Sequence, residues 1–215
     1  MTRLLVATRS RGKQAEFREL LGALPFEIVF PDDIDLAETA DEDRLEVFDT
    51  FEENARAKAQ WFAERSGLAT LADDSGLEVD ALGGAPGVLS KRFGGLNGSE
   101  HEVTAANNAK LIAALRDVPD ALRTARYRCV LVLVRPDGSE LVGDGATEGR
   151  IVCEPRGTNG FGYDPLFLSN ELGKTFGDSS ATEKAAISHR SRAVAAVCRT
   201  ASPWPESCNI GGVGM

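Results

Sequence analysis

The pattern of hydrophobic and polar positions changes period along the chain, from the alternation of strands to the three-to-four spacing of helices. Short apolar runs bounded by Gly, Pro or acidic residues predict strands, and longer runs with one apolar face predict helices. Thr50 with Glu53, and Ser180 with Glu183, have the spacing of a capping box, which marks the start of a helix. The expected strands are residues 3–7, 27–30, 68–72, 77–82, 125–135 and 139–152, and the expected helices are residues 12–24, 51–67, 102–116 and 181–200.

The order of these elements predicts an α/β protein with a mixed sheet. Helices and strands alternate in the first half of the chain, which favours parallel pairing. The two long β-rich segments are separated by Pro136-Asp137-Gly138, a turn sequence that predicts a hairpin and therefore antiparallel pairing. Open sheets of this kind hold ligands in the loops beyond their strand ends, so a site is expected there.

Length and composition narrow the class of protein. With 215 residues, a single folding unit over residues 1–200 is favoured, followed by a Pro- and Gly-containing tail, 201–215, that cannot sustain a helix. No apolar stretch approaches the ~20 residues of a membrane helix, and the N-terminus has no signal-peptide core. The four cysteines have wide, irregular spacings that indicate neither a zinc site nor a disulfide framework. We therefore expect a cytoplasmic protein with no membrane partner.

The charge of the chain argues against a nucleic-acid partner. Lys and Arg number 24 against 33 Asp and Glu, a net charge of −9, whereas nucleic-acid binding relies on cationic contacts. Residues 32–53 alone contain eleven acidic side chains, a composition typical of a solvated loop, although one or two of them can reach a metal. An anionic ligand would need local positive charge or a metal ion.

The first candidate site is VATRSRGKQAEF, residues 6–17, where a strand leads through a polar loop into a helix. Backbone N–H groups and the helix dipole favour an anion at such a turn, and Lys13 adds a positive charge. The loop is not a Walker A sequence, because Ala7 replaces its first glycine and Gln14 replaces its Ser or Thr. From these residues alone, phosphate binding and an ordinary strand–loop–helix turn both stay open.

The second candidate is LADDSGLEVDALGGAPGV, residues 71–88, where an apolar run meets Asp73 and Asp74. Neighbouring carboxylates repel each other and resist burial, a cost that a cation or a proton-transfer role offsets. Adjacent side chains of an extended segment point to opposite faces, so the two acids are expected to differ in role. One of them either caps a turn at Ser75-Gly76 or takes part in catalysis, and the other can hold Mg²⁺ or deprotonate water.

The third candidate combines GTNGFGYDPLF, residues 157–167, with EKAAISHRSRA further along the chain. Glycines beside Phe161 and Tyr163 let a flat ring such as a nucleobase approach and stack, although a glycine-rich turn with core aromatics has the same composition. His189 and Arg190 supply hydrogen-bond donors, which suit a ring oxygen or a phosphate, unless they simply lie on a helix surface.

Taken together and in order, five motifs closely resemble those of the Ham1/RdgB family of inosine triphosphate pyrophosphatases. They are ATRSRGK, F-x-E-N-A-x-x-K-A, LADDSGLEVDALGGAPGV, GFGYDPLF and EKAAISHR, and they cover nearly the whole chain. The resemblance implies an elongated α/β fold with a long mixed central sheet flanked by helices, two lobes with a cleft between them, and a homodimer. It also implies Mg²⁺-dependent hydrolysis of non-canonical purine nucleoside triphosphates (ITP, dITP and XTP) to the monophosphate and pyrophosphate.

The resemblance also implies roles for individual residues. Asp74 corresponds to the catalytic proton acceptor and a metal ligand, with Asp73 and Glu46 as the further metal ligands. Arg9 and Ser10 depart from the family's usual T-G-N or T-x-N, so backbone N–H groups and Lys13 are expected to hold the phosphate. The substrate-binding residues are expected to be Thr8, Arg9, Ser10, Arg11, Gly12, Lys13, Lys58, Ser75, Phe161, Gly162, Tyr163, Asp164, Lys184, His189 and Arg190.

The chemistry of these residue types fits that reaction. Lys13, Lys58 and Mg²⁺ neutralise the triphosphate, and Asp74 deprotonates a water that attacks the α-phosphorus. His189 and Arg190 donate to a purine that carries oxygen at position 6, where adenine presents an amino group instead. The alternatives are a Maf-like hydrolase of modified pyrimidine triphosphates and a non-catalytic nucleotide-binding protein.

Overall fold

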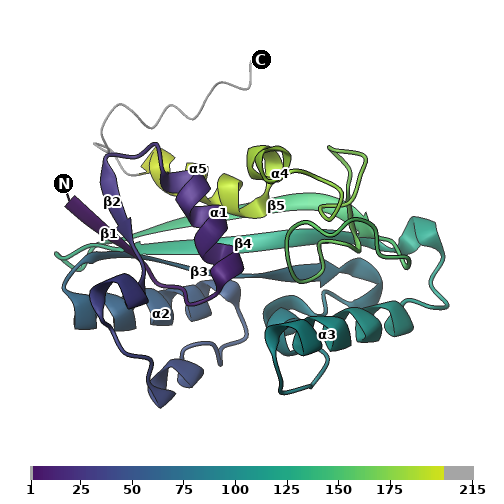
Figure 1. The fold of residues 1–215 in the computed structure, drawn as a ribbon, viewed down its shortest axis with the longest axis horizontal. Helices are drawn as coiled ribbons and strands as arrows, with labels where there is room; N and C mark the ends of the chain where they lie inside the picture. The colour runs from purple at the N-terminus through teal and green to yellow at the C-terminus, as the bar shows by residue number, and fades with distance from the viewer. Residues whose placement is uncertain (1, 201–215) are drawn as a thin grey trace. The chain divides into compact units, whose positions relative to one another are not determined.

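The computed structural model describes residues 2–200, which form an α/β structure around a mixed sheet (Figure 1). The strand order is β2-β1-β3-β4-β5-β6, in which β1 pairs in parallel with β2 and β3, and β5 pairs antiparallel with β6. The predicted α/β class with a mixed sheet flanked by helices is therefore confirmed, whereas the cleft between two lobes stays a prediction. No helix in this part of the chain is long and apolar enough to cross a bilayer. The expected tail, 201–215, lies outside the described residues.

The strands are β1 (Thr2–Val6), β2 (Phe26–Val29), β3 (Ala69–Val79), β4 (Thr124–Val134), β5 (Glu140–Ile151) and β6 (Phe167–Ser169). The α-helices are α1 (Arg11–Leu21), α2 (Phe51–Ser66), α3 (Glu100–Ala114), α4 (Ala181–Ile187) and α5 (His189–Thr200). Short 3-10 helices lie at η1 (Pro31–Ile34), η2 (Ala40–Arg44), η3 (Asp80–Leu82), η4 (Gly87–Arg92) and η5 (Asp120–Leu122).

The chain divides into two compact units. Among the described residues, unit 1 contains the chain up to Asp74, Val130–Gly145 and everything from Arg190 onward, whereas unit 2 contains Ser75–Cys129 and Ala146–His189. Strands β3, β4 and β5 each contribute residues to both units. The expectation of one two-lobed domain over residues 1–200 stays a prediction.

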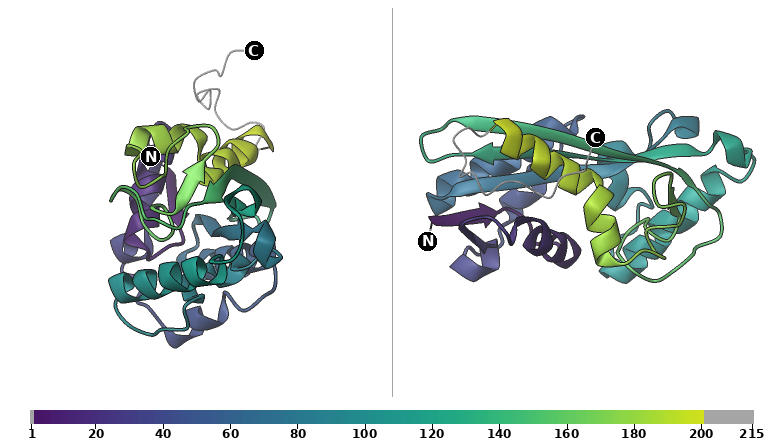
Figure 2. Two further views of the ribbon diagram at one scale, coloured as in Figure 1. Left: turned by 90° about the vertical axis from the view of Figure 1, so that its right-hand side faces the viewer. Right: turned by 90° about the horizontal axis from the view of Figure 1, so that it is seen from above.

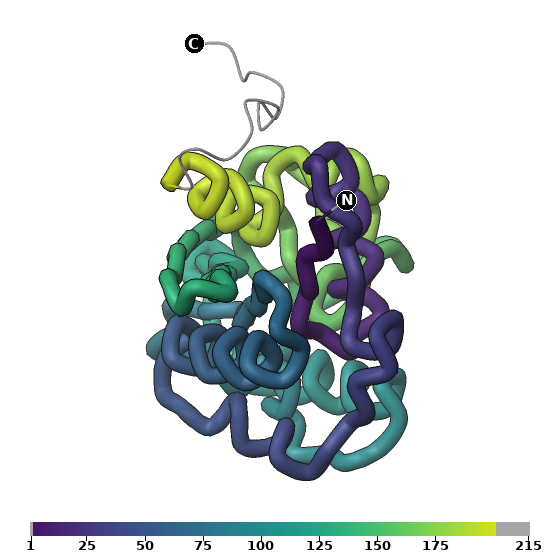
Figure 3. The backbone as a smooth tube through the Cα atoms, turned by 90° about the vertical axis from the view of Figure 1, so that its left-hand side faces the viewer, coloured from purple at the N-terminus to yellow at the C-terminus, as the bar shows by residue number. Residues whose placement is uncertain are grey.

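In unit 1, helices cover both faces of the sheet. Alternate residues of a strand point to opposite faces, and Leu5 and Val132 accordingly pack in one cluster with Ala55 and Phe62 of α2. Figures 1 and 3 show α2 on the opposite side of these strands from α5, and Figure 2 shows α5 lying along β4 and β5. Gly143 of β5 permits this close approach, because a Cβ there would collide with the backbone of α5.

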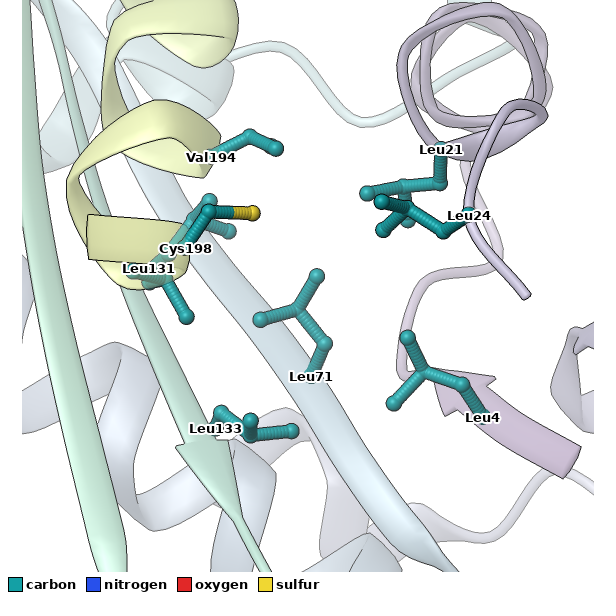
Figure 4. A pocket seen from close by; sticks show the side chains of 9 residues that line it. Leu4, Leu21, Leu24, Leu71, Leu131, Leu133, Val194 and Cys198 are labelled. Atoms are coloured by element: carbon teal, nitrogen blue, oxygen red, sulfur yellow. The ribbon is translucent and has the colours of Figure 1, made fainter. Parts of the chain in front are cut away.

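On the face of unit 1 that carries α1 and α5, apolar side chains surround a small cavity (Figure 4). Leu21, at the end of α1, and Leu24, in the turn after it, point toward Val194 and Cys198 of α5. The remaining lining side chains are Leu4, Leu71, Leu131, Leu133 and Val197. Since none of these side chains is charged, the cavity is a packing feature and offers no contact for a nucleotide.

Unit 2 is built around an aromatic core. The ring of Tyr127, from β4, stacks on His189 with a centroid distance of 4.8 Å and contacts the ring of Phe167 at the same distance. Leu111 and Leu115 from the α3 region join the same cluster, and Figure 1 shows α3 on one side of these strands and α4 on the other. This core fixes the irregular segment before β6, which contains the glycine-rich motif.

The structure differs from the sequence prediction at residues 73–76. The sequence predicts separate strands at 68–72 and 77–82, but β3 is one strand of 11 residues that runs through both acids and through Ser75-Gly76. Neither acid caps a turn there. Asp and Gly are poor strand formers, and the tertiary partners of the two carboxylates override that local preference.

The segment after Ser180 also differs, because two helices replace the single one expected. Ser188 is extended, with φ −66° and ψ 153°, and separates α4 from α5. The carbonyl oxygen of Ile187 accepts a hydrogen bond from the Thr147 hydroxyl at 2.7 Å instead of continuing the helix. The predicted capping box of Ser180 and Glu183 at the start of α4 is confirmed.

Candidate active site

Helix α2 carries two polar side chains on its buried face. Its buried positions follow helical spacing, and Asn54 and Lys58 occupy two of them. Lys58 Nζ donates to Glu46 at 2.5 Å, and Asn54 Nδ2 donates to Asp74 Oδ2 at 2.9 Å. The helix begins at the predicted N-cap Thr50, whose hydroxyl accepts from the Glu53 backbone N–H at 3.2 Å. The start of α2 therefore delivers an amide and an ammonium to the acids of β3 and of the preceding loop.

The loop between β1 and α1 delivers a second lysine. Lys13 lies in the first turn of α1, and its Nζ is 3.0 Å from Asp73 Oδ2. Ser10 occupies the N-cap position but makes no side-chain capping hydrogen bond. The positive end of the helix dipole therefore lies beside Lys13 without an N-cap side-chain bond, an arrangement that favours an anion.

Asp73 faces the side of the sheet that carries α1 and α5. It is 1% exposed, and its Oδ2 lies 3.0 Å from Lys13 and 3.2 Å from Nη2 of Arg190, which also pairs with Glu16. Burial opposes ionisation of this carboxyl, but the positive charges of Lys13, Arg190 and Lys58 outweigh it and lower its pKa. These contacts favour the ionised form of Asp73 and tie its carboxylate to α1 and α5.

Asp74 faces the opposite side, toward α2, as expected for its neighbour in a strand. Burial raises the pKa of its carboxyl, the charge of Glu46 adds to that effect, and Lys58 and Lys13 partly offset it. For Lys58, burial alone would lower the pKa of the ammonium, but Glu46, Asp73 and Asp74 together raise it. Two acids and a permanently charged lysine therefore share one partly enclosed environment.

The donor set of Asp74 and Glu46 fits a hard divalent cation. The charge of Glu46 raises the pKa of Asp74, so the two carboxylates repel each other. A bound cation would remove this repulsion, and carboxylate oxygens are the ligands that Mg²⁺ prefers. Across residues 2–200, no cluster of three or more His, Cys, Asp or Glu side chains forms a ready-made metal cage. Mg²⁺ commonly binds through one or two carboxylates plus substrate phosphates, so a two-carboxylate set is sufficient.

Arg9 binds the acidic segment. Its guanidinium donates to Glu42 at 2.8 Å, to Asp32 at 2.7 Å and to the carbonyl oxygen of Leu36 at 2.9 Å. The first half of the acidic segment is therefore organised by Arg9 and by two 3-10 helices rather than being a simple solvated loop. A phosphate contact by Arg9 stays a prediction, and it would have to compete with these partners.

In unit 2, the glycine-rich motif forms a tight turn around Asp164. This buried carboxylate accepts from the Phe161 backbone N–H at 2.8 Å and from Lys184 Nζ at 2.6 Å. Lys184 Nζ also lies 5.0 Å from the centre of the half-buried Phe161 ring. Gly160 has φ +74°, and a Cβ there would collide with Asp164. The turn presents an aromatic face with an ammonium beside it.

The two aromatics of this turn have different environments. Tyr163 is 4% exposed, its hydroxyl donates to the carbonyl oxygen of Ser90 at 2.8 Å, and burial raises its pKa. It belongs to the core, whereas Phe161 is only half-buried. The carbonyl oxygen of Gly162 accepts from Asn108 Nδ2 at 3.2 Å, which fixes the turn between them.

The expected substrate residues fall into two groups. The side chain of Arg190 joins the charged residues of unit 1, whereas His189, its neighbour in sequence, stacks in the core of unit 2. Unit 1 holds Thr8, Arg9, Ser10, Arg11, Gly12, Lys13, Glu46, Lys58, Asp73, Asp74 and Arg190, and unit 2 holds Ser75, Phe161, Gly162, Tyr163, Asp164, Lys184 and His189. Their contacts with substrate or metal stay predictions.

Sequence reasoning includes Asn54 and Glu16 in two of its motifs but assigns neither of them a role. A signal for Asn54 exists, since it lies on the apolar face of the predicted helix one turn before Lys58, and a polar residue on a buried face needs a specific partner. Glu16 gives no such signal, because its partner Arg190 lies 174 residues away in the sequence.

The sequence of this chain is similar to those of known proteins. The model of the Ham1 family matches residues 4–200. The dITP/XTP pyrophosphatase of Exiguobacterium sibiricum is 48% identical over 192 residues, 89% of this chain and 93% of that protein, and its counterpart from Geobacter sulfurreducens is 47% identical over 195 residues, 91% and 94%.

Solved structures show the same likeness. A HAM1 protein from Coxiella burnetii has a TM-score of 0.77 at 37% identity, covering 90% of this chain and 95% of that chain. A nucleoside-triphosphatase / dITP/XTP pyrophosphatase from Mycobacterium abscessus has a TM-score of 0.70 at 42% identity, covering 92% and 99%. With a family model that spans nearly all of the described residues and relatives of this identity, the chain belongs to the Ham1 family.

Proposed function

We propose that this chain hydrolyses non-canonical purine nucleoside triphosphates, such as dITP, ITP and XTP, to the nucleoside monophosphate and pyrophosphate. The observation that carries the proposal is the charged cluster of unit 1, in which Lys13 and Lys58 lie beside the buried pair Asp73 and Asp74. Relatives named dITP/XTP pyrophosphatase, which match about nine tenths of the chain, support the same activity.

The triphosphate binds to the cationic part of this cluster. Lys13 and the first turn of α1 offer a point charge and a helix dipole to the phosphates, and Lys58 offers a second ammonium that stays charged at every physiological pH. Both lysines already have carboxylate partners, so substrate phosphates exchange for, or share, existing contacts. Pre-positioned charges of this kind cost no reorganisation at the moment of reaction.

Asp74 and Glu46 hold the divalent cation, for which we propose Mg²⁺. When bound, that ion supplies neutralisation of phosphate oxygens where negative charge develops. Asp73, which is held by Lys13 and Arg190, keeps these two cations in place, and its own service as a metal ligand stays a prediction.

Asp74 serves as the proton acceptor. The oxygen of a water attacks the α-phosphorus, its proton passes to the Asp74 carboxylate, and the bond from the α-phosphorus to the bridging oxygen breaks as pyrophosphate leaves. A carboxylate whose pKa is raised by burial is a stronger base than an ordinary Asp, which suits this task.

Unit 2 selects the base. The Phe161 ring stacks on the purine, and Lys184, fixed by Asp164, donates toward an oxygen at position 6. Adenine places an amino group there, so two donors would face each other and one would stay unpaired. His189 and Arg190 act more indirectly in this proposal, because stacking and ion pairing already occupy their side chains.

The activity is tested by a panel of ITP, dITP, XTP, GTP, ATP and modified pyrimidine triphosphates, with and without Mg²⁺, scored for pyrophosphate. We expect release from the first three substrates only, dependent on the metal, and a fall in kcat of ~10²–10⁴-fold in Asp74→Asn. Preference for modified pyrimidines would favour a Maf-like activity instead. Nucleotide binding without pyrophosphate release would indicate a non-catalytic protein.

We also propose that the protein acts in the cytoplasm as a homodimer on free nucleotides rather than on nucleic acid or membranes. The family resemblance implies the dimer, and the net charge of −9 disfavours a polyanionic macromolecule as partner.

A further inference from the structure

We infer that Asn54 is a positioning residue, which uses a single side-chain amide to fix the Asp74 carboxylate and the loop that carries Glu46 relative to each other. The inference rests on the proposed function, because it takes Asp74 and Glu46 as the ligands of one divalent cation.

Both polar atoms of the Asn54 side-chain amide have hydrogen-bond partners, and these partners fix the orientation of the amide. Asn54 is 0% exposed; its Oδ1 accepts from the Phe48 backbone N–H at 2.9 Å, and its Nδ2 donates to the Phe48 carbonyl oxygen at 3.2 Å and to Asp74 Oδ2 at 2.9 Å. Rotating the amide by 180° would set a donor against the Phe48 N–H and an acceptor against the carboxylate, so only one orientation satisfies the partners. The planar amide therefore acts as a rigid connection between the loop and β3.

The Glu46 loop depends on this connection because, apart from the bond of Glu46 to Lys58, the side chains next to Glu46 on its C-terminal side provide little anchoring. Val47 and Phe48 are 62% and 42% exposed, so neither side chain holds the loop against the core. On the other side of Glu46, Leu45 is 9% exposed and joins the apolar cluster of unit 1. Glu46 is thus bonded to Lys58 and lies between one hydrophobic anchor, Leu45, and one backbone clamp at Phe48, which Asn54 makes.

The backbone of Asn54 is itself held firmly, so its side chain can hold Asp74 and the Glu46 loop in fixed positions. It lies on the first full turn of α2, its backbone N–H donates to the Thr50 carbonyl oxygen at 3.2 Å, and its neighbours Phe51 and Ala55 are buried in the core. A side chain with two rotatable bonds on such a helix end has little freedom. The Nδ2 bond also restrains the position of Asp74 Oδ2, since hydrogen bonds to ionised groups are strong.

Two carboxylates bind one small cation well only when their separation is set in advance, and outer partners of metal ligands typically change affinity 10–100-fold. Asn54→Ala removes the clamp and the Asp74 contact together. We expect Mn²⁺, used alone as a spectroscopic probe of the free protein, to bind at least ~10-fold more weakly to this variant. Asn54→Ser retains one polar group and leaves a smaller cavity than Asn54→Ala does. It should show a smaller loss of Mn²⁺ affinity, and it covers the case in which Asn54→Ala does not fold.

Two variants separate positioning from general loss of structure. Asn107→Ala removes an equally embedded amide in unit 2, whose Oδ1 accepts from Gly94 N–H and whose Nδ2 donates to the carbonyl oxygens of Ser90 and Lys91. Phe48→Ala removes only an exposed side chain and keeps the backbone clamp. Mn²⁺ affinity should be unchanged in both, even where Asn107→Ala lowers stability as much as Asn54→Ala does.

The measurement is a Mn²⁺ titration by electron paramagnetic resonance, with amide hydrogen exchange of residues 45–49 recorded without metal. Faster exchange of that segment and weaker Mn²⁺ binding in Asn54→Ala, but not in Asn107→Ala, support the inference. If Glu46→Gln and Asp74→Asn weaken Mn²⁺ binding while both Asn54 variants bind as the unmodified protein does, the inference is wrong and the cation site stands. If the unmodified protein binds no Mn²⁺ even with inorganic tripolyphosphate added to complete the coordination, the proposed cation site fails and the inference fails with it.

Discussion

Asp73 and Asp74 are neighbours in sequence but have opposite electrostatic surroundings. The Asp73 carboxyl is held ionised by Lys13 and Arg190, so its pKa lies below the ordinary value, whereas burial raises the pKa of Asp74. The alternation of a β-strand produces this contrast, because it sends one side chain toward α1 and α5 and the other toward α2. Asp73 therefore stabilises the fold through its ion pairs, whereas the raised pKa of Asp74 suits the proposed role of proton acceptor.

The two amide variants should consequently differ in stability. Asp73→Asn leaves the buried Arg190 and the partly buried Lys13 with less compensating charge, and we expect a loss of ~3–5 kcal/mol in the free energy of unfolding, typical of a broken buried ion pair. Asp74→Asn removes a charge that burial disfavours, so its free energy of unfolding should equal or exceed that of the unmodified protein at pH 7. Urea unfolding of both variants decides this. A more stable Asp73→Asn than Asp74→Asn would contradict the assignment.

At the residue scale, the sequence could predict that the two acids differ, but not which partner each one finds. Periodicity within a strand is local information, and it correctly separates the faces. Arg190 lies 117 residues from Asp73 in the sequence, and Asn54 lies 20 residues from Asp74. Such pairs are decided by the packing of helices on the sheet, which no local pattern encodes.

At the scale of elements, capping chemistry was predictable and helix continuity was not. Ser180 and Glu183 form the capping box that the spacing indicates, and Glu183 also accepts from Lys174 at 2.8 Å. No Pro or Gly marks the break at Ser188 in the sequence. The break depends instead on a distant residue, because the Thr147 hydroxyl donates a hydrogen bond to the Ile187 carbonyl oxygen. Similarly, β3 continues through Asp73 and Asp74 because buried cations and an amide receive them.

The Glu183 cap predicts a pH dependence of stability. The hydrogen bond from Lys174, followed by those from Ser180, lowers the pKa of Glu183 to about 2, below its ordinary value near 4.5. A lowered pKa in the folded state means that the ionised form stabilises the fold above pH ~4.5, and that this contribution is lost as pH falls toward 2. Glu183→Gln should therefore be less stable than the unmodified protein at pH 7, with the difference shrinking between pH ~4.5 and pH ~2.

Urea unfolding at pH 7, 5 and 3 measures this difference, with Lys174→Met as the comparison variant. Removing Lys174 takes away the largest cause of the shift, so the same pH trend should persist in weaker form. A Glu183→Gln deficit that stays constant over this pH range would show that the carboxylate charge contributes nothing to the cap.

At the scale of the whole molecule, a protein with a net charge of −9 is proposed to bind a polyanion. The conflict is resolved locally, because Lys13, Lys58 and the N-terminus of α1 gather in unit 1 and supply positive charge there. The stacking ring and Lys184 gather in unit 2. Each unit has its own core and its own part of the proposed recognition chemistry, so the two parts of a nucleotide are expected to affect different segments of the chain.

That division predicts separable protection from hydrogen exchange. Inorganic tripolyphosphate with Mg²⁺ carries the charge of the substrate without its base, and it should slow amide exchange at residues 8–13, because those N–H groups lie at the loop and first turn that precede and include Lys13. Inosine carries the base without phosphate, and it should slow exchange at residues 160–164, where the Phe161 turn lies. Adenosine is the matched control for inosine and should give less protection there, since its amino group faces the Lys184 donor. Protection of residues 160–164 by tripolyphosphate alone, or of residues 8–13 by inosine alone, would mean that the two recognition tasks are not divided in this way.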